Sequence, residues 1–208
     1  VNGVPYRHPA LVANMAASLD IVSGGRLELG LGAGWNEQET KAYGIDLLPM
    51  GQRMDRFEEA VEVIDSLLAH EITTFQGKYF QLDQARCEPK GLQRPRPPIV
   101  IGGGGEKRTL RIAARFAQHW NLPFATPEVF RKKNEILLAH CEAVGRDSSL
   151  IMRSVQIEST ADQDPAEVAD SAAALFAAGV DQVILTLRTP YRAERVAALA
   201  KSLEAIGP

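Results

Sequence analysis

The spacing of apolar residues predicts an alternation of helices and strands along most of the chain. After Pro9, which suits a first helical turn because it lacks an N–H, Leu11, Met15 and Leu19 recur at helical intervals. Similar periods elsewhere predict further helices, and short alternating or continuous apolar runs predict strands. Strands are expected at 26–32, 99–101, 120–124, 152–158 and 180–187. Helices are expected from Pro9 to about residue 22, in a short stretch ending at Tyr43, from Arg53 to Leu68, after Gly102–Gly105, at about 127–144, at 165–178 and from about Pro190.

One long segment lacks such a pattern. Residues 72–98 are expected to be irregular, because glycines and prolines forbid a long regular element there. They are Gly77, Pro89, Gly91, Pro95, Pro97 and Pro98.

The order of elements is a helix followed by five strand–helix units, which favours a parallel sheet with helical crossovers. Five units are too few for a complete eight-stranded barrel. Two interpretations remain: an open doubly wound sheet, or a TIM barrel without about three N-terminal units. The chain opens on Val1-Asn2-Gly3 without a Met, which reads like the interior of a longer sequence.

Composition narrows the class of protein. The chain has 208 residues, of which 45% are hydrophobic, and this suits a globular domain with a sizeable core. The net charge of -3, without a basic block, argues against a nucleic-acid partner, and no apolar stretch is long enough to span a membrane. Cys87 and Cys141 form no C-x-x-C motif, so no metal site is expected and a reducing cytoplasm is the expected setting.

Two glycine clusters lie at the C-terminal ends of predicted strands, where α/β proteins bind ligands. Gly102, Gly103, Gly104 and Gly105 precede a helix that contains Arg108 and Thr109, and this arrangement predicts a phosphate site. The other cluster is Gly32-Ala33-Gly34-Trp35. Neither matches a P-loop or a dinucleotide fingerprint, and a tight turn that binds nothing is the alternative.

An ordered set of motifs resembles the luciferase-like monooxygenase family, in the branch usually described as coenzyme F420-dependent. The match is dense over residues 4–124 and loose beyond. One segment departs from it, because Ala117-Gln118-His119-Trp120 stands where the family often has Ala-Asp-Gly-Trp or Ala-Asp-x-Trp. The motifs are Tyr6-Arg7-His8-Pro9, Leu19-Asp20, Ser23-Gly24-Gly25-Arg26, Gly30–Trp35, Glu39, Tyr43-Gly44, Arg53, Arg56, Glu59, Cys87-Glu88-Pro89 and Pro97–Gly105.

This resemblance implies a fold and a class of activity. The fold is a luciferase-like TIM barrel, with residues 1–208 as a single domain that holds only the last five strand–helix units. The activity is F420-dependent hydride transfer to or from a small organic molecule. The alternatives are an FMN-dependent monooxygenase that uses O₂ and a separate flavin reductase, and a non-catalytic cofactor-binding fragment or pseudoenzyme. The resemblance also implies a homodimer for the full-length protein.

Other candidate residues carry two interpretations each. Trp35 is expected either to form a wall beside the cofactor ring or to plug the gap between loop and barrel. His8 either contacts the cofactor or substrate or caps the adjacent helix. Trp120 and Asn121 are candidate pocket residues, with core packing favoured for Trp120. No catalytic side chain is assigned, since the cofactor would supply the redox chemistry.

Overall fold

The structure is a computed structural model that describes residues 1–204 and 206. Within these residues the chain has an α/β fold in which six strands form one parallel sheet, in the spatial order β1-β2-β5-β6-β7-β8. Strands β3 and β4 form a separate antiparallel hairpin. The strands are β1 (Asn2–Gly3), β2 (Leu29–Gly32), β3 (Thr73–Gln76), β4 (Gln81–Ala85), β5 (Ile99–Gly102), β6 (His119–Pro123), β7 (Met152–Ser159) and β8 (Gln182–Leu187).

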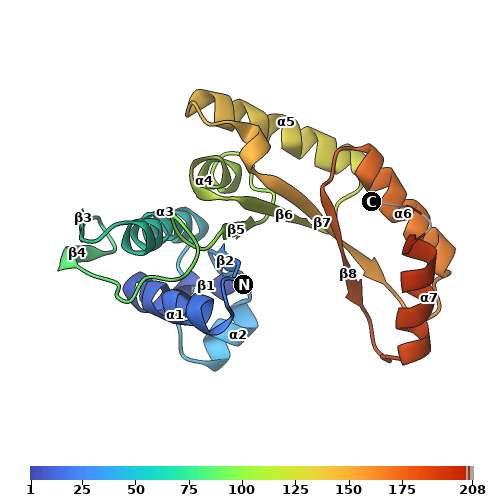
Figure 1. The fold of residues 1–208 in the computed structure, drawn as a ribbon, viewed down its shortest axis with the longest axis horizontal. Coiled ribbons are helices and arrows are strands. Elements are labelled where there is room, and N and C mark those ends of the chain that lie inside the picture. Colours follow the sequence, from blue (N-terminus) through green and yellow to red (C-terminus); the bar gives the residue numbers. More distant parts are fainter. Residues whose placement is uncertain (205, 207–208) are drawn as a thin grey trace.

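Helices line the outer side of the sheet, which runs as an arc from β1 to β8 (Figure 1). Parallel strands need long crossovers, and the segments that join neighbouring strands each contain a helix. In the described part of the chain, no helix combines the length and apolar character needed to cross a membrane. The α-helices are α1 (Pro9–Val22), α2 (Glu37–Ala42), α3 (Met50–Ala69), α4 (Thr109–Phe116), α5 (Pro127–Ala143), α6 (Pro165–Ala177) and α7 (Ala193–Glu204), and short 3₁₀ helices cover Val4–Tyr6 and Ser148–Leu150.

Most of the expected elements are confirmed. The alternation of strands and helices is present, and α1 begins at Pro9 and ends just before Ser23, as the apolar spacing predicts. The strand expected from Arg26 begins only at Leu29. The sheet also contains β1, which no pattern predicted because two residues are too few to show a period.

The expectation that residues 72–98 are irregular throughout is wrong, because this segment contains the β3–β4 hairpin. The carboxylate of Glu59 on α3 holds the turn of the hairpin. It accepts hydrogen bonds from the backbone N–H groups of Lys78, Tyr79 and Phe80, at 2.9, 2.8 and 3.2 Å. The hairpin therefore depends on a contact with a helix some twenty residues earlier, which local composition does not reveal.

Successive residues of a strand face opposite sides of the sheet, and in β2 and β5 every second residue is buried. The buried residues of β2 and β5 join helix side chains in one core; they are Leu29, Leu31, Ile99 and Ile101. The residues between them face the inner side of the arc and are half-buried. They are mostly small, so the backbone itself lies near the inner surface: Gly30, Gly32, Val100 and Gly102.

A buried carboxylate joins the end of α1 to the loop before β5. Asp20 is fully buried, and it accepts hydrogen bonds from the backbone N–H groups of Leu92 and Gln93 at 2.6 and 2.9 Å and from the Gln93 side chain at 2.8 Å. Burial raises the pKa of this carboxyl, but the hydrogen bonds from Gln93 and Leu92 outweigh burial and lower the pKa below its ordinary value. Ionised Asp20 therefore stabilises the folded chain.

Replacing Asp20 by Asn should lower the free energy of unfolding by about 1–3 kcal/mol at neutral pH, because a charged acceptor is lost at a buried site. Since its pKa is lower in the folded state, the stabilisation is complete above the unfolded value, near 3.8, and is lost as the pH falls through the folded value. Urea unfolding should show the difference between wild type and D20N shrinking in acid, with D46N at an exposed carboxylate as control. A difference that stays constant through this acid range would contradict the assignment.

Candidate functional site

The two glycine loops lie beside each other at one edge of the sheet. Strands β2 and β5 are neighbours, and their register pairs Leu31 with Ile101. Strand β6 follows, with Asn121 paired to Gly102. Because the strands are parallel, their C-terminal ends share this edge, which is where α/β sheets and barrels bind ligands.

The first loop, Gly32–Trp35, is held tightly by its surroundings. Gly34 has a φ of +83°, and a Cβ there would lie 2.9 Å from Pro5 Cγ. From the other side, Arg53 on α3 donates a hydrogen bond through Nη1 to the Gly34 carbonyl at 2.9 Å. Trp35 is 82% exposed, so in the described chain it does not plug the gap between loop and sheet. Its role beside a cofactor ring remains a prediction.

The second loop is half-buried at Gly102, Gly103 and Gly104 and exposed at Gly105. Gly103 has a φ of +116°, and its N–H donates to the Asn121 carbonyl at 2.9 Å. A Cβ on Gly105 would lie 2.7 Å from Thr109 Oγ1, so a side chain does not fit without movement. The helix α4 begins only at Thr109, so three residues separate the glycines from the helix that they were expected to open directly.

A cavity of about 430 Å³ opens beside this second loop. Lys133 on α5 donates to Glu106 at 2.7 Å, and this contact lowers the pKa of the Glu106 carboxyl. Arg108 donates to the Gly51 carbonyl at 2.7 Å and forms an ion pair with Asp55, so its guanidinium is held against α3. The cavity is lined by Met50, Met54, Gly104, Gly105, Glu106, Lys107, Arg108, Thr109 and Lys133.

These residues fit a phosphate group. Three cations and one carboxylate line the cavity, and two of these cations already have acidic partners, since Arg108 pairs with Asp55 and Lys133 with Glu106. Two further lining residues are glycines that a Cβ would crowd. Backbone N–H groups freed by glycine, with nearby Lys and Arg, form the donor set that binds phosphates in many proteins. The predicted residues Gly104, Gly105, Arg108 and Thr109 thus meet at one cavity.

The structure places His8 at the start of α1. Its Nδ1 accepts a hydrogen bond from the Ala10 N–H at 3.2 Å, which caps the helix. The ring also packs edge-on against Phe80, with 5.3 Å between ring centroids. This contact confirms the interpretation of His8 as a helix cap, while its contact with a cofactor or substrate stays a prediction.

Trp120 and Asn121 occupy different environments. Trp120 is fully buried, stacks on Phe130 with 5.9 Å between ring centroids, and donates through Nε1 to the Gly103 carbonyl at 2.9 Å. It therefore supports the second glycine loop from the core. Asn121 is half-buried on the inner side, where its Nδ2 donates to Ser154 Oγ at 2.8 Å.

The inner side of the sheet carries a polar network that the sequence did not predict. His119, which is almost fully buried, lies 3.0 Å through Nδ1 from Glu28 Oε2 and 2.7 Å through Nε2 from Ser154 Oγ. Glu28 and His119 are 91 residues apart in the chain, so no local motif joins them. Within the described residues, no group of three His, Cys, Asp or Glu side chains is placed to hold a metal ion.

Gln118, which stands where the family often has Asp, has a structural role in this chain. Its Oε1 accepts hydrogen bonds from Arg96 Nη1 at 2.7 Å and from the Ile99 N–H at 3.1 Å. Arg96 in turn pairs with Asp65 on α3, at 2.6 Å. The amide oxygen thus takes part in a structural contact at the start of β5, opposite the edge that carries the glycine loops.

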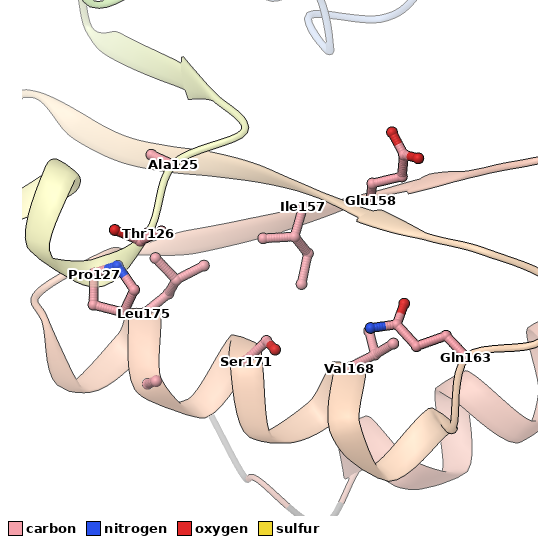
Figure 2. A pocket seen from close by; sticks show the side chains of 10 residues that line it. Ala125, Thr126, Pro127, Ile157, Glu158, Gln163, Val168, Ser171 and Leu175 are labelled. Carbon is pink, nitrogen blue, oxygen red and sulfur yellow. The ribbon is translucent and has the colours of Figure 1, made fainter.

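A second cavity, of about 300 Å³, lies between β7 and α6. Figure 2 shows Ile157 pointing from β7 towards Leu175 and Val168 on α6, while Glu158 points to the opposite side. Glu158 accepts a hydrogen bond from Arg188 at 2.7 Å. As far as the described residues show, no Lys or Arg lines this cavity, so it does not suit a phosphate.

Comparison with known proteins identifies the family of this chain and supports its fold class. The family model for luciferase-like monooxygenases matches residues 3–206, and the chain belongs to this family. Its parallel α/β sheet is that of the luciferase-like TIM barrels. An F420-dependent secondary alcohol dehydrogenase aligns over all of this chain and 78% of its own, with a TM-score of 0.89 and 19% sequence identity.

Two curated relatives resemble the chain in sequence. A pyrimidine monooxygenase of Agrobacterium fabrum is 33% identical over 159 residues, which cover 72% of this chain and 42% of the relative. An FMNH₂-dependent dimethylsulfone monooxygenase of Pseudomonas putida is 31% identical over 112 residues, which cover 54% of this chain and 30% of the relative. The chain thus spans less than half the length of both relatives.

The hydrogen bond from Trp120 to Gly103 leads to a test of the loop. Trp120→Phe keeps an aromatic ring but removes the donor, so we expect a loss of about 1–3 kcal/mol in the free energy of unfolding. Hydrogen–deuterium exchange at Gly103–Glu106 should also become faster. Phe130→Leu, which removes the stacking partner and keeps the donor, should destabilise the chain without that local effect. Equal exchange at the loop in both variants would contradict a specific role for the Trp120 N–H.

Proposed function

We propose that this chain forms the phosphate-binding part of the cofactor site in a flavin-type oxidoreductase. The observation that carries the proposal is the cavity beside Gly102–Gly105, where Gly104 and Gly105 meet the side chains of Lys107, Arg108 and Lys133. The loop amides would bind the phosphate, and the cations would balance its charge. Membership of the luciferase-like monooxygenase family supports a flavin-type cofactor at this edge.

FMN is the cofactor we favour, with oxygen transfer to a small organic molecule as the reaction. The support comes from relatives that are more than 30% identical, among them the pyrimidine monooxygenase and the dimethylsulfone monooxygenase, whose name includes FMNH₂. When bound, reduced FMN would supply the electrons that activate O₂, and a separate flavin reductase would supply the reduced flavin. The chain's own part is to bind the phosphate, orient the ring and exclude water.

F420-dependent hydride transfer is the second candidate. The ordered motifs over residues 4–124 favour it, and they led the sequence interpretation. The solved F420-dependent dehydrogenase shares the whole fold, but at 19% identity this likeness concerns the fold alone. Both cofactors carry a phosphate, so the Gly102–Gly105 loop suits either one.

Replacing Gly103 by Asp should abolish phosphate binding at the second loop. The φ of +116° is strained for any side chain, and the new carboxylate would repel the phosphate. We expect the dissociation constant of the cofactor to rise by at least about tenfold, which corresponds to roughly 1.4 kcal/mol. The matched control is Gly145→Asp, which makes the same change of charge at another positive φ, +65°, in the turn after α5. If both variants bind cofactor as the wild type does, the loop has only a structural role.

Fluorescence titration of the full-length protein with FMN and with F420 separates the two candidate cofactors. Preferential binding of FMN, together with O₂ consumption when a flavin reductase supplies FMNH₂, is the expected result. Preferential binding of F420 would support hydride transfer instead. If neither cofactor binds, the proposed function is wrong, and a non-catalytic protein with this fold becomes the remaining interpretation.

A further inference from the structure

Phe124 has a backbone conformation that its side chain does not favour. It follows the last residue of β6 and has a φ of +52°. Within the described residues only one other non-glycine residue, Gln84, has a positive φ. In this region the Cβ crowds the following carbonyl, so glycine or asparagine is the usual occupant and a bulky side chain is an outlier.

The turn between β6 and α5 explains the positive φ of Phe124, but it does not explain why the residue is a phenylalanine. The chain passes from β6 to the cap of α5 at Thr126 within two residues, and the Phe124 N–H donates to the Gln156 carbonyl at 2.9 Å. A glycine would satisfy the same geometry without strain. Burial in the core does not stabilise the aromatic ring either, since Phe124 is 59% exposed. Neither the backbone nor the core accounts for a phenylalanine here.

The position of Phe124 connects it with the proposed phosphate loop. It lies at the C-terminal end of β6, and this strand is the direct neighbour of β5, which carries Gly102–Gly105. Two residues before Phe124, the side chain of Leu122 lies 2.9 Å from where a Cβ on Gly104 would stand. Neighbouring strands are about 4.8 Å apart, so the end of β6 is within reach of a ligand anchored on the loop.

We propose that Phe124 contacts the flat ring system of the cofactor whose phosphate binds at Gly102–Gly105. The inference rests on the proposed function, and it adds a residue that no motif indicated. FMN and F420 both join a three-ring system to their phosphate through a ribityl chain, so with the phosphate at the loop the rings would lie beyond it, where the end of β6 is a neighbour. An exposed aromatic side chain on a fixed turn offers a flat apolar surface to such rings.

The test uses the full-length protein and the variant Phe124→Gly. Binding of FMN and of F420 is measured by titration, and binding of D-ribitol 5-phosphate, which lacks the rings, is measured by calorimetry. The dissociation constant of the ring-bearing cofactor should rise about tenfold, whereas that of D-ribitol 5-phosphate should not change. The melting temperature should stay constant or rise, because glycine relieves the positive φ. Phe124→Tyr, which keeps the ring, should bind as the wild type does.

Gln84→Gly is the matched control, because it relieves a φ of +45° in the β3–β4 hairpin. It should change stability in the same direction and leave both dissociation constants unaltered. Unchanged cofactor affinity in Phe124→Gly would overturn the inference, as would a fall in melting temperature or an equal loss of D-ribitol 5-phosphate, both of which indicate a structural role. Failure of the wild type to bind either cofactor would instead remove the proposed function, and this inference with it.

Discussion

The parallel pairing of β2, β5 and β6 is the constraint on which the rest of the structure depends. Its register places Leu29 beside Ile99 and Ile101 beside Trp120, so these side chains form one apolar layer that the helices cover. Parallel strands all end at the same edge. The burial of residues that take no part in binding therefore brings together both glycine loops and the turn at Phe124.

The elements that could be predicted from the sequence are those that local spacing encodes. Helix α1 shows the helical period and a proline at its start, and β5 is an apolar run between Pro98 and Gly102. The hairpin and the inner network could not be predicted in this way. The hairpin requires the Glu59 carboxylate, and the network requires Glu28 to meet His119 across the sheet, so both depend on contacts that arise only after the chain has folded.

At the candidate site, too, local sequence predicts some features, and others depend on contacts that form only in the folded chain. Glycines at strand ends predicted an exposed backbone, because glycine is the residue that allows close approach. The arrangement of charge beside that backbone could not be predicted, since Lys133 comes from α5 and Arg108 is held by Asp55 on α3. Packing was foreseen for Trp120, but its hydrogen bond to Gly103 depends on the three-dimensional position of a loop that precedes it by 17 residues.

On the proposed function, the choice between FMN and F420 would be made by groups that meet the rings, because the proposed phosphate loop would recognise only what the two cofactors share. Backbone amides and cations respond to charge, and the charge at the loop would be a phosphate with either cofactor. The fold does not discriminate either, since an F420-dependent enzyme matches it along the whole chain. Exposed aromatic side chains at the same edge, such as Trp35 and Phe124, are of the type that can respond to the shape and polarity of a ring. On the proposed function, cofactor preference would therefore be a property of the strand ends around the loop, and sequence changes there would alter it while the proposed phosphate site stays the same.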